Sequence, residues 1–251
     1  MGSLLRAPGG EEASRTPPLP LFVNDELRVI DLGRIGYAAA YELQEAEAAA
    51  VLADRESGKP RVGTLFLLEH DPVVTVSRRA GASGHVLGSP EMFAAQGVDV
   101  RETDRGGDVT YHGPGQLVGY AILDLNLLKL GLHEYMRLLE QSVIDAVATW
   151  GIPGERDPAA TGVWVRRGEH PSKLCAFGVR VRRWVSMHGL GLNVNPDMSH
   201  FDLIVPCGLA GRSVTSLAQM LGDECPAMKN VKETVAGSLA SCIQQRLASM
   251  P

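Results

Sequence analysis

A glycine-rich segment in the middle of the chain constrains its fold most strongly. Residues 105–116 read RGGDVTYHGPGQ, in which four glycines and a proline surround Arg105, His112 and Gln116. Glycine loses more conformational freedom on folding than any other residue, so this density marks backbone that turns tightly or approaches a ligand closely. The segment lacks the Gly-Lys-Ser/Thr ending of a phosphate-binding loop and the glycine spacing of a dinucleotide-binding loop. From these residues alone, a ligand-binding loop and an ordinary turn between two strands both stay open.

Composition limits the class of protein. The 251 residues are 45% hydrophobic, enough to bury one large core, so one domain is expected. A net charge of −5 gives no general attraction to nucleic acid or to a membrane, and no apolar run approaches the roughly 18 residues of a membrane-spanning helix. The four cysteines show neither paired spacing nor a C-x-x-C metal pattern, which fits a reducing compartment. They are Cys175, Cys207, Cys225 and Cys242.

The order of predicted elements favours a mixed fold. We expect residues 1–26 to form a disordered leader without a targeting signal, and residues 27–251 to form a single catalytic domain. Strands are predicted over 27–32, 64–69, 73–77, 162–165, 173–181 and 184–193, and helices over 37–54, 90–97, 132–150, 214–221 and 231–247. Strands and helices without regular βαβ alternation predict an α+β fold, a mixed β-sheet layered with helices.

Two residues in the second half suggest acyl-transfer chemistry. Cys207 lies between Pro206 and Gly208, a turn that can expose a thiol beside unobstructed backbone N–H groups. A thiol of pKa about 8.5 becomes a better nucleophile when a cation such as Lys173 lies near it, and that lysine can also carry the proton. The alternative is a buried, inert Cys207 and a solvated Lys173. Because the 34 residues between them (207 − 173) force no contact, spacing alone favours this alternative.

Six segments occur in the order found in lipoyl(octanoyl) transferases, a family that the chain resembles over about residues 27–221. They are residues 68–75 (LEHDPVVT), 105–116, 161–165 (TGVWV), 173–180 (KLCAFGVR), 188–193 (HGLGLN) and 206–208 (PCG). The resemblance implies the fold of the biotin and lipoate protein ligase catalytic domains. It also implies transfer of an octanoyl group from octanoyl-acyl carrier protein to a specific lysine of a lipoyl domain, the first step of endogenous protein lipoylation.

The resemblance assigns roles to particular residues. Cys207 matches the nucleophile that forms the acyl-thioester, and Lys173 matches the lysine that lowers its pKa. The matching substrate-binding residues are Arg105, Gly106, Gly107, Asp108, Val109, Thr110, Tyr111, His112, Ala176, Phe177, Gly178, Gly189, Leu190 and Gly191. His70 and His188, together with His112, are expected to form a polar cluster near the thiol. At Gly191 the family commonly has alanine, and the missing methyl is expected to affect chain-length preference more than chemistry.

Two further features of the second half, Cys175 and a group of arginines, each allow two interpretations. Cys175 is a rival nucleophile, because on a strand it would share a face with Lys173. It lies in mid-strand rather than on a turn, so we favour Cys207. Five arginines also occur within 18 residues, and they indicate either a docking patch for the acidic acyl carrier protein or a solvated strand face. They are Arg166, Arg167, Arg180, Arg182 and Arg183.

The resemblance also sets expectations for cofactors and partners. No metal, ATP or organic cofactor is expected, because a thioester donor already carries the activation energy. The expected partners are octanoyl-acyl carrier protein as donor, and as acceptors the lipoyl domains of 2-oxoacid dehydrogenase complexes and the glycine cleavage H protein. We expect a cytoplasmic enzyme, or a mitochondrial one in a eukaryote. Two alternatives are an ATP-dependent lipoate or biotin ligase on the same fold, and a non-catalytic scaffold that binds acyl carrier protein.

Overall fold

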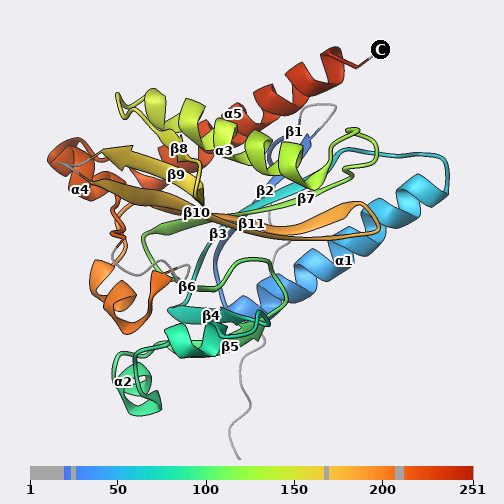
Figure 1. Ribbon diagram of the computed structural model, residues 1–251. Coiled ribbons are helices and arrows are strands. Elements are labelled where there is room, and N and C mark those ends of the chain that lie inside the picture. The colour runs from blue at the N-terminus through green and yellow to red at the C-terminus, as the bar shows by residue number, and fades with distance from the viewer. Residues whose placement is uncertain (1–19, 24–26, 167–169, 207–211, 251) are drawn as a thin grey trace, which may run out of the picture.

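Two β-sheets organise the computed structural model, which describes residues 20–23, 27–166, 170–206 and 212–250 (Figure 1). The large sheet has the order β1 (Pro20–Val23), β2 (Leu27–Ile35), β3 (Gly63–His70), β7 (Gln116–Leu123), β11 (Val185–Asn193), β10 (Pro171–Arg182), β9 (Ala160–Arg166) and β8 (Glu155–Asp157). The small sheet has the order β5 (Asp99–Thr103), β4 (Val73–Ser77) and β6 (Val109–His112). Each sheet contains one parallel pair, β2 with β3 and β4 with β5, and both sheets are therefore mixed.

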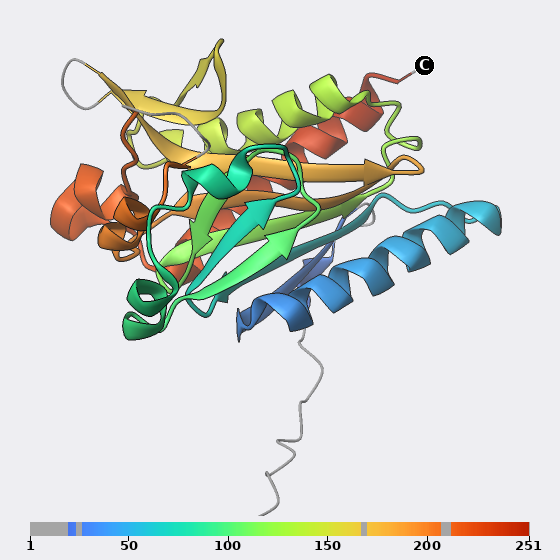
Figure 2. The same ribbon diagram turned by 60° about the horizontal axis from the view of Figure 1, so that its bottom comes forward.

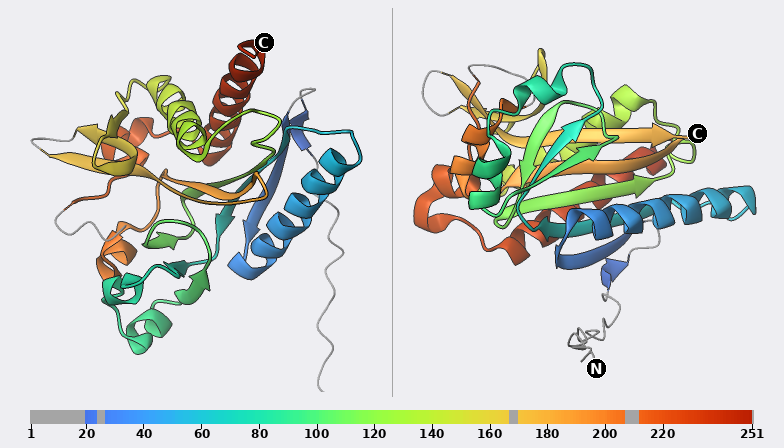
Figure 3. Two further views of the ribbon diagram at one scale, coloured as in Figure 1. Left: turned by 45° about the vertical axis from the view of Figure 1, so that its right-hand side comes forward. Right: turned by 90° about the horizontal axis from the view of Figure 1, so that it is seen from below.

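Helices cover both faces of the large sheet. The helices are α1 (Tyr37–Glu56), α2 (Pro90–Ala95), α3 (Leu132–Ala148), α4 (Leu217–Leu221) and α5 (Met228–Ala248), with short 3₁₀ turns η1 (Ala82–His85), η2 (Met198–Leu203) and η4 (Gly222–Glu224). Helices α3 and α5 lie side by side on one face, and α1 lies on the other (Figure 3). The small sheet lies beside α1 on that same second face (Figure 2). The predicted α+β class, a mixed sheet layered with helices, is confirmed.

The alternation of side chains along β3 explains why its sequence is apolar throughout. Leu65 and Leu67 belong to the core under α3 and α5, whereas Phe66 and Leu68 belong to the core under α1. Successive residues of a strand point to opposite faces, so a strand covered on both faces has no polar positions. The central strand β7 is buried along its whole length for the same reason.

Several predicted elements are confirmed and others need correction. Strand β4 has the predicted bounds, and α1, α3, β10 and β11 agree within a few residues. The predicted helix over 214–221 begins only at Leu217, because the Ser216 side chain caps it and Val214 forms a bridge with Lys173. Strands β5, β6 and β8 were not predicted. Residues 20–23 form β1 and pair with β2, within the segment expected to be a disordered leader; residues 1–19 and 24–26 lie outside the described residues.

The arginines of the second half do not form one patch. Arg166 ends β9 and pairs with Pro171 at the start of β10, whereas Arg182 ends β10 and pairs with Val185. At about 3.3 Å per residue, the two ends of β10 are roughly 36 Å apart. Arg167 lies outside the described residues. The arginines are close in sequence because one strand, β10, separates them, but they lie at opposite ends of that strand. The predicted docking patch of five arginines is therefore wrong.

Among the residues that the structure describes, no helix combines the length and the apolar character needed to cross a membrane.

Candidate active site

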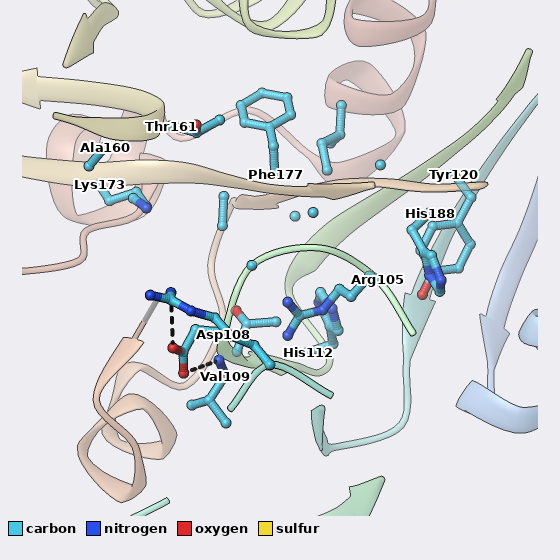
Figure 4. Close-up of a pocket in the computed structure, with 18 of the residues that line it drawn as sticks. Arg105, Asp108, Val109, His112, Tyr120, Ala160, Thr161, Lys173, Phe177 and His188 are labelled. Atoms are coloured by element: carbon cyan, nitrogen blue, oxygen red, sulfur yellow. Dashed lines mark hydrogen bonds and ion pairs between the residues drawn. The ribbon is translucent and has the colours of Figure 1, made fainter. Parts of the chain in front are cut away.

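A pocket of about 270 Å³ lies between the two sheets (Figure 4). The small sheet contributes β6, the large sheet contributes β10 and β11, and α1 contributes its first residue, Tyr37. Lys173 lies toward one end of the pocket, and His188 with Tyr120 lies at the other (Figure 4). Twelve of the fourteen predicted substrate-binding residues line it. They are Arg105, Gly107, Asp108, Val109, Thr110, His112, Ala176, Phe177, Gly178, Gly189, Leu190 and Gly191.

The other two predicted substrate-binding residues have structural positions. The Gly106 amide donates to the Val179 carbonyl at 2.9 Å and so ties the glycine-rich loop to β10. Tyr111 is buried in the core of the small sheet, where its ring contacts the His200 ring at a tilt of 38°, with the centroids 4.7 Å apart. Neither residue lines the pocket; both support the residues that do.

Some lining residues were missed by the sequence analysis. They are Tyr37, Arg79, Tyr120, Ala159, Ala160 and Thr161. Thr161 opens one of the quoted segments, so extending that segment by two residues would have found its neighbours. Tyr120 follows the glycine-rich run within a strand, where period-two alternation with Val118 was the available signal. Nothing in the sequence marks Tyr37, which meets the pocket only because α1 starts there.

The glycines of β11 and β10 permit close backbone approach. A Cβ atom on Gly189 would lie 2.1 Å from the Gly119 carbonyl oxygen, and one on Gly178 would lie 2.8 Å from the Gly106 oxygen. Contacts under 3.0 Å cannot be relieved cheaply when the neighbour is backbone. Gly178 therefore lets β10 meet the glycine-rich loop, and Gly189 lets β11 meet β7, which is a stricter requirement than room for a ligand.

Arg105 and Asp108 stabilise the glycine-rich loop. The Arg105 Nη2 atom donates to both the carbonyl and the hydroxyl of Thr75, each at 3.0 Å. The Asp108 Oδ1 atom accepts from His85 Nδ1 at 2.7 Å, and Asp108 Oδ2 faces Arg79 Nη1 at 3.5 Å (Figure 4). Both charged groups are therefore engaged with the protein, and they fix the loop that faces β10.

His112 is buried and held in one tautomer. Its Nδ1 atom lies 2.5 Å from Gln116 Oε1, while Gln116 Nε2 donates to the Tyr111 carbonyl and to Asn193 Oδ1. Because both Nε2 protons are used in this way, Oε1 must accept and His112 Nδ1 must donate. Burial, aided by repulsion from His70, lowers the pKa of His112 to about 3. The ring is therefore neutral at pH 7, and its Nε2 keeps a lone pair.

Gly191 faces this histidine. A methyl group there would lie 3.1 Å from Gln116 Oε1 and 3.3 Å from His112 Cε1. The alanine common in the family would therefore press on the hydrogen-bonded pair in this chain, so Gly191 accommodates the pair as well as widening the wall.

His70 supports the pocket from behind. It does not line the pocket; its Nε2 atom accepts from the Tyr120 hydroxyl at 2.7 Å, and its Nδ1 donates to the Ile35 carbonyl at 2.8 Å. Burial lowers the pKa of His70 to about 4, so this ring is also neutral near pH 7. Its ring centroid lies 5.8 Å from that of His112, so these two histidines are neighbours; a cluster near the Cys207 thiol stays a prediction.

His188 occupies a strained position in β11. Its φ of 61° is in the left-handed region, which costs a residue other than glycine about 1–3 kcal/mol. Period-two alternation would put His188 on the face of Leu190 and Leu192, under α3 and α5. Instead its ring lies 5.8 Å from the Tyr41 ring of α1, on the pocket face. The Gln44 side chain accepts the His188 backbone N–H at 2.8 Å and so stabilises this twist.

Lys173 is buried in the wall of the pocket. Its side chain is 5% exposed, and its Nζ atom lies 4.9 Å from the centroid of the Trp164 ring. Its backbone amide donates to the Ser213 carbonyl at 2.9 Å, and a small second hollow is lined by both Lys173 and Pro206. Cys207, the predicted nucleophile, lies outside the described residues. Of the described residues on either side of it, Ser213 contacts Lys173 and Pro206 lines the same small hollow as Lys173.

Cys175 does not share a face with Lys173, contrary to the sequence expectation. The pairing of β10 with β9 is irregular between these two residues, and such a bulge shifts the alternation of side chains. Cys175 is fully buried in the core under α3 and α5. Burial raises the pKa of its thiol, although Lys173 acts in the opposite direction. A thiol in this position is inert toward a ligand in the pocket.

The described residues contain no group of three or more His, Cys, Asp or Glu side chains that could hold a metal ion.

Comparison with known proteins places the chain in a family. A family model described as lipoyl protein ligase A/B catalytic domain matches residues 37–240. An octanoyltransferase of Chloroflexus aurantiacus is 48% identical over 215 residues, which cover 85% of this chain and 92% of that protein. The chain belongs to the lipoyl protein ligase A/B catalytic domain family. Within this family it is an acyltransferase, as the resemblance of its six segments predicted.

Solved structures show the same fold. A bipartite lipoate protein ligase from Thermoplasma acidophilum aligns with a TM-score of 0.64 at 14% identity, covering 87% of this chain and 84% of that one. A biotin protein ligase from Aquifex aeolicus aligns with a TM-score of 0.50 at 15% identity, covering 86% and 70%. The predicted similarity to the catalytic domains of biotin and lipoate ligases is confirmed for the fold.

Proposed function

We propose that this chain transfers an octanoyl group from octanoyl-acyl carrier protein to a specific lysine of a lipoyl domain, through a thioester on Cys207. The observation that carries the proposal is the position of Lys173. It lines the pocket, and on either side of the segment that contains Cys207, Ser213 accepts its backbone N–H and Pro206 lines the same small hollow. The similarity to proteins named octanoyltransferase supports the acyl group and the reaction class.

The first half-reaction acylates the enzyme. The Cys207 proton passes to Lys173, and the thiolate attacks the thioester carbonyl of the donor. Backbone N–H groups of the 206–208 turn and the glycine-rich loop would hold the oxyanion. The bond to the pantetheine sulfur then breaks, and that thiolate takes the proton from Lys173. A buried lysine suits this exchange because its proton is shielded from bulk water.

The second half-reaction moves the acyl group to the acceptor. The acceptor lysine amine attacks the octanoyl-enzyme, Lys173 accepts its proton, and Cys207 leaves as a thiolate. The acceptors that fit are the lipoyl domains of 2-oxoacid dehydrogenase complexes and the glycine cleavage H protein. No ATP enters either step, because the C–S bond broken in the donor is as activated as the one formed on the enzyme.

The pocket suits an acyl chain of moderate length. Its floor is formed by the small residues Ala176, Gly178, Gly189 and Gly191, whereas the side chains of Phe177 and Leu190 pack on the opposite face of the sheet, against the core under α3 and α5. Burying the seven-carbon tail of an octanoyl group at ~0.8 kcal/mol per carbon gives roughly 5–6 kcal/mol before losses. The neutral His112, whose Nε2 keeps a lone pair, and the Tyr120 hydroxyl, which His70 engages, add polar support without placing a charge beside the chain.

A lipoate-protein ligase on the same fold is the second candidate. Lipoate ligases are among the structural neighbours, and one of them is bound with ATP. Their identities of 13–14% carry the fold alone. A ligase would activate a free acid with ATP and would need no cysteine, so ATP dependence separates the two functions.

Intact-mass measurement tests the proposal. Purified protein incubated with octanoyl-acyl carrier protein, without ATP, should gain one octanoyl mass that maps to Cys207, and should lose it when a lipoyl domain is added. Cys207→Ser should abolish turnover, whereas Cys175→Ser, in the core, should retain it. A label at Cys175, or transfer that needs ATP and free octanoate, would contradict the proposal.

A second experiment separates the two duties of Lys173. Lys173→Arg keeps a cation beside the thiol but cannot act as a base, because guanidinium stays protonated at any working pH. Some self-acylation should remain, because the cation still favours the thiolate, while transfer to the lipoyl domain should slow by at least about 100-fold. Wild-type rates in both half-reactions would remove the proton-transfer role from Lys173.

A further inference from the structure

Two hollows follow one another along the same face of the large sheet. The first is the pocket described above, floored by Gly178 and Gly189. The second is a groove of about 240 Å³ between α1 and the far ends of β10 and β11. The walls of this groove include Ala48 and Leu52 of α1, together with Met187 of β11. The groove therefore combines these apolar side chains with four charged residues, Glu45, Arg180, Arg182 and Arg183.

In the pairing of β10 with β11, one residue pair, Val179 with His188, lies between the two hollows. Gly178 pairs with Gly189 at the end of the pocket, and Arg180 pairs with Met187 at the start of the groove. Ala176, Gly178 and Arg180 alternate along one face of β10. The row of small residues that floors the pocket thus ends at the Arg180 side chain.

A hydrogen-bonded cluster spans this boundary. We define the Asp104 cluster as Asp104, Arg180, Tyr41 and His188. Asp104 Oδ1 accepts from His188 Nε2 at 3.0 Å, and Asp104 Oδ2 accepts from the Tyr41 hydroxyl at 2.9 Å and from Arg180 Nη1. Arg180 Nη1 also lies 3.2 Å from the Tyr41 oxygen. His188 faces the pocket while Arg180 faces the groove, so the cluster is the wall between them.

We propose that the Asp104 cluster sets the upper limit of acyl chain length by closing the pocket against the groove behind it. This inference rests on the proposed function and adds a direction to it: the thioester lies at the Lys173 end of the pocket, and the methyl end points toward His188. An octanoyl tail ends before the cluster. A longer tail must break hydrogen bonds to a carboxylate, and each added methylene gains less than such a charge-assisted bond contributes.

The strain at His188 fits this role. The left-handed backbone brings the imidazole out of the core under α3 and α5 and onto Asp104, and Gln44 holds it there. Without the twist, the cluster would lack the member that faces the pocket. The groove beyond is lined by Arg180 on its pocket side and by apolar side chains such as Ala48, Leu52 and Met187, and it could hold the extra methylenes if the Arg180 side chain were removed.

The test compares donors of different chain length. Octanoyl-, decanoyl- and dodecanoyl-acyl carrier protein are assayed for transfer to a lipoyl domain, and the readout is the ratio of kcat/KM for dodecanoyl to that for octanoyl. Arg180→Ala extends the row of small residues into the groove and should raise this ratio by about tenfold or more. Adding Ala48→Phe to that variant should fill the groove and return the ratio toward the wild-type value.

Two controls keep the outcome clear. Arg182→Ala removes the next arginine on the same face, beyond the cluster, and should leave the ratio unchanged. The double variant Arg180→Ala with Asp104→Ala removes both charges, so no buried charge is left unpaired, and it should match the single variant.

Two results would overturn the inference. One is a folded Arg180→Ala enzyme whose ratio stays within twofold of wild type, and the other is a wild-type enzyme that uses dodecanoyl as well as octanoyl donors. If the wild-type protein forms no octanoyl-enzyme, the proposed function is wrong rather than this inference. The intact mass of the protein after incubation with the octanoyl donor distinguishes the two failures.

Discussion

The two faces of the large sheet differ in composition and in role: one forms a packed core and the other forms the pocket. The face under α3 and α5 is packed with leucine and valine, in a cluster that includes Leu139, Leu174 and Leu192. The opposite face carries glycines, the histidines His70 and His188, and two hollows. The first face supplies apolar burial, which is the main driving force of folding. The second face buries less apolar surface, because it contains the hollows and buried polar groups. A substitution should therefore lower stability on the face under α3 and α5, and should lower turnover on the pocket face.

The largest effect on stability is expected on the packed face. Leu139 is fully buried in α3, and Leu139→Ala should lower the free energy of unfolding by roughly 2–5 kcal/mol, through lost burial and the cavity left behind. Urea denaturation measures this change. The kcat/KM of the protein that remains folded, measured with an octanoyl donor, should stay near wild type. A selective loss of turnover at unchanged stability would contradict the division between the faces.

A smaller loss of stability, now with loss of activity, is expected beneath the pocket. Gly189→Ala would bring a methyl against the Gly119 carbonyl, and should cost roughly 1–3 kcal/mol while displacing the pocket wall. Gly237→Ala is the matched control, because Gly237 lies in α5 with open space around it. That control should gain up to about 1 kcal/mol from helix propensity. Equal effects at both glycines would mean that the close approach seen at Gly189 is not required.

The buried histidines give the pocket face a dependence on pH. The pKa values of His70 and His112 are lowered by burial to about 4 and about 3, from an ordinary value near 6.5. Their contribution to stability is complete above pH 6.5 and is lost as the pH falls toward 4, because the unfolded chain then binds protons that the folded chain refuses. Each histidine adds a slope of about 1.4 kcal/mol per pH unit in that window.

Denaturation between pH 6.5 and 4.5 checks this slope in two variants. His70→Gln should reduce the slope by one proton, whereas His133→Gln, at an exposed position on α3, should leave it unchanged. A slope that His70→Gln does not change would show that His70 is protonated in the folded protein, contrary to its buried hydrogen bonds.

The two faces also differ in how far they follow from sequence. The amphipathic spacing of α3 and the apolar run of β3 come from local patterns, and both elements were predicted. The lining of the pocket followed from quoted segments rather than from periodicity. What sequence could not show are exceptions to alternation, namely the left-handed His188 and the irregular pairing between Lys173 and Cys175. Each inverts the face that a side chain occupies.

Contacts between distant segments were equally hidden. Asp104 lies in a loop after β5, and β5 lacks the alternation of apolar residues from which a strand is predicted. Its partners Tyr41 and Arg180 are 63 and 76 residues away. These residues meet because the loop after β5 lies beside both α1 and the strands β10 and β11, so the Asp104 cluster could be found from the structure alone.

The smallest expected effect is at Gly191, where the two roles of the pocket face meet. The added methyl of Gly191→Ala needs the His112–Gln116 pair to give by a few tenths of an ångström. Because neighbouring side chains rather than backbone are displaced, the free energy of unfolding should change by less than about 1 kcal/mol. The methyl moves His112 toward the acyl chain, so kcat/KM for a decanoyl donor should fall relative to that for an octanoyl donor. The rate of self-acylation at saturating octanoyl donor should stay constant, since Lys173 is untouched. If the loss is equal for both donors, then His112 takes part in the chemistry itself and Gly191 does not tune chain length.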